Sequence, residues 1–269
     1  MDDLLTRQGN KCKLDLEWDD RGVVPEVVYP DVEFLFRRMN EVTLKSVDAK
    51  AGEGILDVGC GRGIDGVEMA KCGAIVIGLE PSIVMIAHAN NHIAANGQKL
   101  SLVRGVGEHL PFRAKSLDKV VCKGALDHFI DPAKVMSQMA AVLKAEGRAI
   151  IAVANFASLG FRLGRMVWWL RKKLGFKDTQ RRMPWEVPSD HTCKFDYSFF
   201  LCLTNRYFQV EQVTGVSLFF GFPWWGLCLS KCPRGAALAV LNLLDKVASK
   251  LPMLSDIVVI KCKPKPEQS

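Results

Sequence analysis

The 269-residue sequence has few of the features that mark secreted, disulfide-bonded or membrane-spanning proteins. Its nine cysteines include no Cys-x-x-Cys pair, so reduced thiols of the cytoplasm are expected rather than disulfides or metal ligands. No run reaches the roughly 18 uncharged apolar residues that a spanning helix needs. The first residues show no basic region followed by an apolar one, so no secretory signal is expected. Repeats and low-complexity tracts are also missing, which leaves one enlarged α/β domain as the simplest account.

The Gly-x-Gly-x-x-Gly pattern of dinucleotide-binding turns does not start at Gly59, the first glycine after the expected strand, and Gly66 offers only a loose substitute for its third glycine. In its place, apolar residues 55–58 contain Asp57 and run into glycines at alternate positions, Gly59, Gly61 and Gly63. This order predicts a buried strand that ends in a turn where the backbone approaches a ligand closely. Glu80 closes the next apolar strand and is placed to bind the two hydroxyls of a ribose. The pattern therefore predicts an adenosine-type cofactor.

The order Asp57-x-Gly59-x-Gly61-x-Gly63 resembles the first motif of class I S-adenosylmethionine-dependent methyltransferases. S-adenosylmethionine carries an ammonium and a sulfonium but no phosphate, so an acid in this turn suits it, whereas a pyrophosphate would be repelled. The resemblance implies that Asp57 lies at the aminopropyl end of the cofactor and Glu80 at its ribose. The implied cofactor-binding residues are Asp57, Gly59, Cys60, Gly61, Gly63, Glu80, Pro81, Val106, Gly107, Glu108 and Lys123.

Residues 105–112 resemble the family segment Gly-Asp-Ala-Glu-x-Leu-Pro-Phe, whose acid bonds the adenine amino group. Val106 stands in the place of that acid, so the backbone groups of Gly107 and Glu108 are expected to bind the edge of the ring instead. Lys123 ends the fourth expected strand, which in the family lies beside the methionine part of the cofactor.

Alternating strand and helix patterns over residues 50–155 predict a parallel sheet with right-handed crossovers. Two more strands are expected near residues 208–211 and 256–260, so the resemblance implies a doubly wound, mainly parallel seven-stranded sheet, a Rossmann-like methyltransferase fold with helical lid insertions. We expect a single methyltransferase domain over residues 1–269, comprising an N-terminal lid arm (1–49), a cofactor-binding core (50–155) and helical cap insertions (156–207 and 218–255).

The aromatic content of the later segments bears on the acceptor. Five of the six tryptophans lie between Trp168 and Trp225, where family members that act on lipids, quinones or polyketides build a lid. A small apolar or amphipathic acceptor is therefore expected.

The candidate catalytic base is His191, with Asp190 orienting its ring; the alternative is that His191 only caps a helix or bonds backbone. His128 is expected to shape the cofactor pocket. A carbon acceptor would need no base, and no metal site is expected.

The formal net charge of +7 is concentrated in residues 161–173. At helical spacing Leu163, Val167, Leu170 and Leu174 form an apolar stripe, with basic side chains opposite. Two interpretations stay open: a cap helix with a solvated basic face, or a peripheral membrane contact through residues 161–174 or 219–225. Nucleic acid is an unlikely partner, because the Asn/Asp-Pro-Pro-Tyr/Phe motif of base-modifying enzymes is absent after the fourth strand.

Two alternatives from other functional classes stay open. The chain could be a catalytically inactive S-adenosylmethionine-binding or scaffold protein, which the valine at position 106 favours. It could instead be a nicotinamide oxidoreductase; against this, a fingerprint that begins at Gly59 would need its third glycine at position 64, where the chain has isoleucine.

Overall fold

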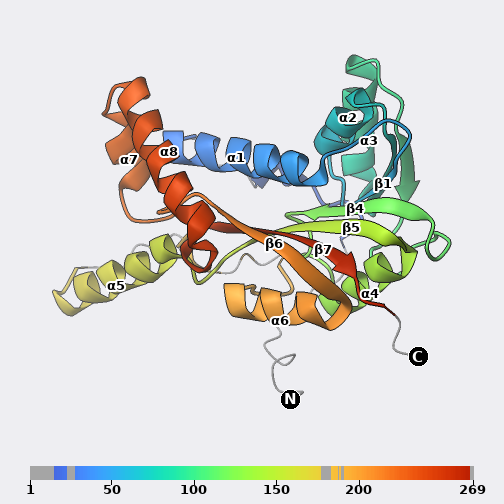
Figure 1. Ribbon diagram of the computed structural model, residues 1–269. Coiled ribbons are helices and arrows are strands. Elements are labelled where there is room, and N and C mark those ends of the chain that lie inside the picture. Colours follow the sequence, from blue (N-terminus) through green and yellow to red (C-terminus); the bar gives the residue numbers. More distant parts are fainter. Residues whose placement is uncertain (1–14, 23–27, 177–182, 187, 189–190, 267–269) are drawn as a thin grey trace.

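The computed structural model describes residues 15–22, 28–176, 183–186, 188 and 191–266 (Figure 1). Its centre is a seven-stranded sheet in the order β3-β2-β1-β4-β5-β7-β6. The first five strands run parallel, and β7 runs antiparallel to both of its neighbours. The strands are β1 (Gly54–Val58), β2 (Ile75–Glu80), β3 (Ser101–Arg104), β4 (Leu117–Lys123), β5 (Leu143–Ala154), β6 (Phe208–Val216) and β7 (Ile257–Pro264).

Helices cover both faces of the sheet, which confirms the predicted fold class (Figure 1). One face carries α1 (Pro30–Val47), α2 (Ile64–Lys71) and α3 (Ile83–Ala95), and the other carries α4 (Pro132–Val142) and α6 (Tyr197–Tyr207). Three further helices gather at one end of the molecule: α5 (Leu159–Lys173), α7 (Trp225–Ser230) and α8 (Arg234–Lys250). Two short 3-10 turns complete the described elements, Asp20–Gly22 and Pro252–Leu254.

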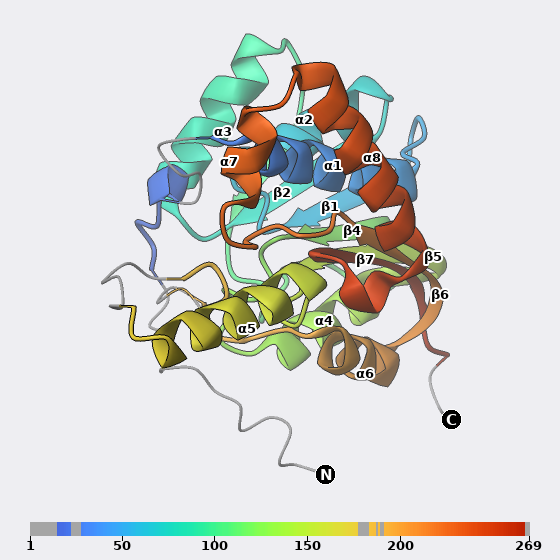
Figure 2. The same cartoon turned by 90° about the vertical axis from the view of Figure 1, so that its left-hand side faces the viewer.

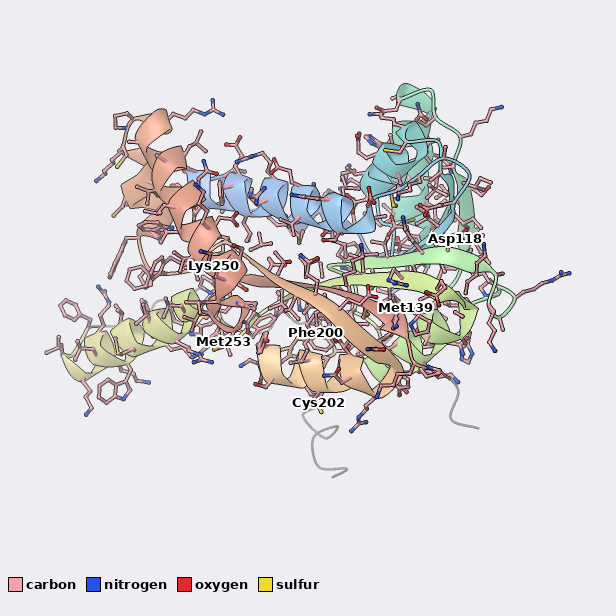
Figure 3. The ribbon with its side chains drawn as sticks, in the orientation of Figure 1. Asp118, Met139, Phe200, Cys202, Lys250 and Met253 are labelled. Atoms are coloured by element: carbon pink, nitrogen blue, oxygen red, sulfur yellow. The ribbon has the colours of Figure 1, made fainter. Side chains whose placement is uncertain are left out.

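Successive side chains along the central strands point to opposite faces of the sheet. Each face therefore has its own apolar core. Ile55 of β1 faces the cluster under α1 and α2, and its neighbour Leu56 faces the cluster under α4 and α6. Figure 3 shows Met139 of α4 and Phe200 of α6 on this second face, where both side chains are fully buried. The sheet is therefore covered on both sides, so its ligand-binding edge lies at the carboxyl ends of the parallel strands.

Two of the end helices, α7 and α8, pack against α1. Phe34 of α1 packs against Leu229 of α7 and Leu241 of α8. Arg38 of α1 donates to Asp245 of α8, with Nη2 and Oδ2 2.8 Å apart. None of the helices in the described ranges combines the length and the apolar character that crossing a bilayer demands.

Candidate active site

The turn after β1 is formed by the three glycines of the motif, and all three adopt positive φ: +72° at Gly59, +52° at Gly61 and +69° at Gly63. A Cβ added at Gly59 would lie 2.5 Å from the Cβ of Ala125, in the segment that follows β4. Glycine is therefore required at Gly59 both for the backbone conformation and for this close approach. The turn brings backbone N–H groups to the carboxyl edge of the sheet, as the sequence predicted.

Glu80, at the end of β2, lies beside the turn and is only 6% exposed. Its Oε2 accepts a hydrogen bond from the N–H of Gly61 (3.0 Å), and its Oε1 accepts one from the N–H of Ser82 (3.0 Å). Burial raises the pKa of this carboxyl, and the two backbone hydrogen bonds oppose that rise. Each oxygen has a second lone pair, so the carboxylate can hold the turn in place and still accept two ribose hydroxyls.

Asp57 and Glu80 belong to one group of charges, together with Asp65 and Lys123. Lys123 Nζ lies 2.5 Å from Asp65 Oδ2 and 2.6 Å from Asn40 Oδ1, which ties α1 to the site. Burial and the negative charge of Asp65 raise the pKa of Asp57 to about 7; Lys123 acts in the opposite direction and Glu80 adds to the rise. Three acids against one lysine suit a ligand that carries an ammonium and a sulfonium, and they disfavour a pyrophosphate.

Two other predicted cofactor residues, Cys60 and Pro81, bond neighbouring strands. Cys60 is buried, with its Sγ 2.7 Å from where a Cβ of Gly78 would stand, and its N–H donates to the Leu79 carbonyl (3.1 Å). Pro81 follows Glu80, and its carbonyl accepts a hydrogen bond from Arg104 Nε (3.2 Å).

The segment expected to bind adenine is held mainly by the start of α4. Glu108 Oε1 accepts hydrogen bonds from the N–H groups of Ile130 (2.9 Å) and Asp131 (3.3 Å). Gly107 is buried, and a Cβ there would lie 3.0 Å from the ring of Phe129. Val106, which precedes Gly107 in the sequence, is half-buried. Recognition of adenine by the backbone of this segment stays a prediction.

The candidate base, His191, faces a carboxylate that the sequence did not single out. Its Nδ1 lies 3.0 Å from Oδ2 of Asp127, and Asp127 is only 4% exposed. Burial would raise the pKa of Asp127, but the hydrogen bond from His191 and the charges of His191 and His128 outweigh it, so that pKa is lowered. The expected partner, Asp190, lies outside the described residues. Asp127 could have been suspected only as an acid in the loop four residues after the end of β4.

One short segment joins this pair to the glycine turn. Ala125 meets Gly59, and the ring of Phe129 lies 3.7 Å from the position of a Cβ on Gly59. Asp127 lies between these two residues. Thr192, next to His191, donates its N–H (2.8 Å) and its hydroxyl (3.0 Å) to the Asp127 carbonyl, and its hydroxyl also contacts the Phe129 carbonyl. The His–Asp pair and the cofactor turn therefore form one continuous site.

Comparison with known proteins identifies the central part of the chain. The family model described as "Methyltransferase domain" matches residues 56–151. The ubiquinone biosynthesis O-methyltransferase of Vibrio campbellii is 35% identical over 119 residues, which are 44% of this chain and 50% of that protein. Residues 56–151 are a class I methyltransferase domain. The cofactor of this family is S-adenosylmethionine, and the acidic glycine turn fits it.

Solved structures agree with the methyltransferase fold. A putative methyltransferase from Bacillus halodurans superimposes with a TM-score of 0.57 at 19% identity, covering 84% of this chain and 98% of that one. An S-adenosylmethionine-dependent methyltransferase from Aquifex aeolicus gives 0.54 at 14% identity, covering 91% and 98%. The chain spans about half the length of the curated relatives it matches.

An N-terminal strap, residues 15–22, lies against the candidate site. The Leu16 carbonyl accepts from the N–H of Ile83 (3.0 Å), and the Trp18 carbonyl accepts from the hydroxyl of Ser82 (2.6 Å). Asp20 binds Arg62 of the glycine turn through two hydrogen bonds of 2.6 Å. The Trp18 ring also lies 5.4 Å from the ring of His128. The strap thus contacts both the cofactor turn and the histidine side of the site.

Two histidines and one carboxylate meet in the methyltransferase site. The rings of His128 and His191 are 4.4 Å apart edge to face, and donor atoms of Asp127, His128 and His191 all lie within 4.8 Å of one another. Imidazole nitrogens and a carboxylate are donors that zinc and related divalent ions accept. Sequence reasoning expected no metal site, because it did not bring these three side chains together.

Proposed function

We propose that the chain transfers a methyl group from S-adenosylmethionine to a hydroxyl oxygen of a small apolar or amphipathic acceptor, of the quinol or phenol class. The relatives named ubiquinone biosynthesis O-methyltransferase support this acceptor class, although they align with under half of the chain. The aromatic cap region also supports an apolar acceptor, because Phe156, Phe161 and Trp185 form a buried apolar cluster close to His191.

The observation that carries the proposal is the continuity between the acidic glycine turn and the Asp127–His191 pair. When bound, S-adenosylmethionine supplies a methyl group on a sulfonium, which is already a strong electrophile. The protein has to align the acceptor and exclude water, and such alignment can contribute about 7–11 kcal/mol. Asp57 and Glu80 hold the ammonium and ribose ends in this scheme.

His191 accepts the proton of the acceptor hydroxyl as the new oxygen–methyl bond forms. With Nδ1 turned to Asp127 at 3.0 Å, we place proton acceptance at Nε2. Asp127 fixes the ring orientation and stabilises the imidazolium that results. The N-terminal strap and the buried cluster of Phe156, Phe161 and Trp185 act as a lid that keeps water from the reacting groups.

A peripheral membrane contact would complement this activity without being required for it, because quinols and similar acceptors partition into bilayers. Residues 161–174 and 219–225, expected from the sequence to make such a contact, lie at the same end of the molecule (Figure 2).

The decisive experiment measures cofactor binding and methyl transfer separately. Calorimetry with S-adenosylhomocysteine should show binding to the wild type and to His191→Gln with equal affinity. Transfer of labelled methyl to a catechol that carries an alkyl chain should fall by about 10²–10⁴ in kcat for His191→Gln. His92→Gln on α3 is the matched control and should retain full activity.

Three results would contradict the proposal in different ways. No heat with S-adenosylmethionine or S-adenosylhomocysteine supports an inactive scaffold, and a fluorescence change with NADH supports an oxidoreductase. Loss of transfer in EDTA, recovered with Zn²⁺ or Mn²⁺, would assign Asp127, His128 and His191 to a metal ion instead of a proton-accepting pair.

A further inference from the structure

Helix α5 is packed tightly at its beginning and projects from the body towards its end (Figure 1). A Cβ on Gly160 would lie 2.5 Å from the Phe220 carbonyl oxygen, and a Cβ on Gly164 would lie 2.5 Å from the ring of Trp185. These two glycines, one helical turn apart, let the first half of α5 approach its neighbours closely. The second half has no comparable buried residue, since the buried residues of α5 are Gly160, Phe161 and Gly164.

Large apolar side chains are exposed along this projecting half and on the adjacent start of α7. The sequence pattern placed Leu170 and Leu174 on an apolar stripe, yet they are 51% and 67% exposed. Trp169 and Trp224 are also more than half exposed. We name this surface the α5 tip patch; its members are Met166, Trp169, Leu170, Leu174, Phe176, Trp224 and Leu227.

Cations are interleaved with the aromatic rings of the α5 tip patch. The guanidinium of Arg171 lies 5.5 Å from the ring centre of Trp168, 4.8 Å from that of Phe176 and 5.4 Å from that of Trp224. Lys173 Nζ lies 4.1 Å from the ring centre of Trp169. Arg171 therefore joins α5 to the segment before α7 in one surface, and its aromatic and basic groups suit the boundary between water and lipid.

The two stretches of chain that form the α5 tip patch carry charge of one sign. Residues 157–176 contain five basic side chains and no Asp or Glu, and residues 219–244 contain two basic side chains and no Asp or Glu. Together these equal the formal net charge of the whole chain, +7. Of the neighbouring acids, Glu33 lies 3.6 Å from Arg234, and Glu186 accepts a backbone hydrogen bond from Met183. The surface therefore complements an anionic partner.

We propose that the α5 tip patch docks on the surface of an anionic bilayer. Trp169, Leu170 and Leu174 enter the headgroup region, and Lys172, Lys173 and Arg162 lie against lipid phosphates. A second copy of the chain is a poorer occupant, because a two-fold contact would oppose one basic surface to another. The proposal rests on the proposed function in one respect: an apolar acceptor partitions into the bilayer, where a docked enzyme can bind it.

The test is co-sedimentation of the full chain with vesicles of phosphatidylcholine alone and of phosphatidylcholine mixed equally with phosphatidylglycerol. The wild type should pellet with the anionic vesicles and stay mostly in the supernatant with the neutral ones. Lys172→Glu/Lys173→Glu should weaken binding by at least about tenfold, and Trp169→Ser/Leu174→Ser by a similar factor. The matched controls, Lys99→Glu/Lys134→Glu and Ile75→Ser, should bind as the wild type does.

The proposal is overturned if the wild type pellets with neither vesicle, or if the control charge variant loses as much binding as the patch variant. Sedimentation velocity provides the second readout: a dimer that Trp169→Ser/Leu174→Ser converts to monomer would assign the patch to self-association. Binding of S-adenosylhomocysteine and transfer to a detergent-solubilised catechol should be the same in all these variants. A failure of membrane docking is thereby distinguishable from a failure of the proposed function.

Discussion

The cofactor side and the acceptor side of the site are built in different ways. On the cofactor side, a run of neighbouring residues supplies glycine conformations and backbone N–H groups, and Glu80 holds them from the adjacent strand. On the acceptor side, Asp127 and His191 come from distant segments, which hydrogen bonds from Thr192 to the Asp127 carbonyl hold together. A binding turn formed by backbone groups is specified by neighbouring residues. A contact between two side chains far apart in the sequence depends on the tertiary fold.

The largest expected effect tests the acceptor side. Asp127→Asn should lower kcat by about 10²–10³, because an amide can turn the His191 ring into the wrong tautomer and no longer stabilises an imidazolium. S-adenosylhomocysteine affinity should be unchanged. Asp118→Asn, at the opposite end of β4, is the control. If Asp127→Asn and the control retained equal activity, the pair would have no role in the reaction.

A second pair of variants tests the cofactor side. Gly59 and Gly97 both have positive φ, but an added Cβ clashes only at Gly59, and at Gly97 it meets nothing within 4 Å. Gly97→Ala should cost about 1 kcal/mol of unfolding free energy and no cofactor affinity. Gly59→Ala should cost about 3 kcal/mol and weaken S-adenosylhomocysteine binding by roughly thirtyfold. Thermal unfolding and calorimetry measure the two effects, and equal losses in both variants would contradict the packing argument.

A third prediction compares two buried carboxyls that share a pKa of about 7, Asp57 in the site and Asp256 outside it. Burial raises both values above 3.8, so the folded state holds these protons more tightly than the unfolded state does. The stability they contribute is present below about pH 4 and is lost as the pH rises through about 7. Asp57→Asn and Asp256→Asn should each flatten the fall in Tm over this range.

Cofactor binding should separate the same two carboxyls. The ammonium of S-adenosylhomocysteine favours the ionised form of Asp57, so affinity should rise about tenfold between about pH 6 and about pH 8. Asp256→Asn should leave that rise intact. A flat pH profile in the wild type would place the ammonium away from Asp57.

The smallest expected effect concerns the N-terminal strap. Arg62→Ala removes a half-exposed ion pair with Asp20, which is worth about 1 kcal/mol. S-adenosylhomocysteine should therefore bind no more than about fivefold more weakly, through faster dissociation measured by stopped flow. Arg37→Ala, which removes the exposed pair with Glu41 on α1, should not change the rate. An equal effect of both variants would exclude a specific role for the strap.

The fold and the cofactor turn could be predicted because they depend on short-range patterns. The apolar run before Asp57, the alternate glycines and the acid ending the next strand fix strand, turn and register within one βαβ unit. The partner of His191 could not be predicted in this way. Adjacency in sequence favours Asp190, but Asp127 reaches the ring because the loop after β4 is hydrogen-bonded to Thr192, the neighbour of His191.

Helix α5 shows a second limit of sequence patterns. The apolar stripe that includes Leu170 and Leu174 indicates an amphipathic helix. Periodicity predicts which side of the helix is apolar, but it does not predict what packs against that side. Packing of α5 ends near Trp185, so the far part of the stripe is exposed. The same pattern is thus compatible with a packed cap and with a surface that binds a partner, and only the three-dimensional arrangement separates them.

The antiparallel direction of β7 has a practical consequence for experiments on this protein. Because β7 runs against β5, Pro264 leaves the sheet at the edge opposite the glycine turn. An affinity handle or fluorophore attached beyond that residue would leave the cofactor entrance unobstructed. Surface-immobilised enzyme would therefore be suited to kinetic measurements of ligand exchange.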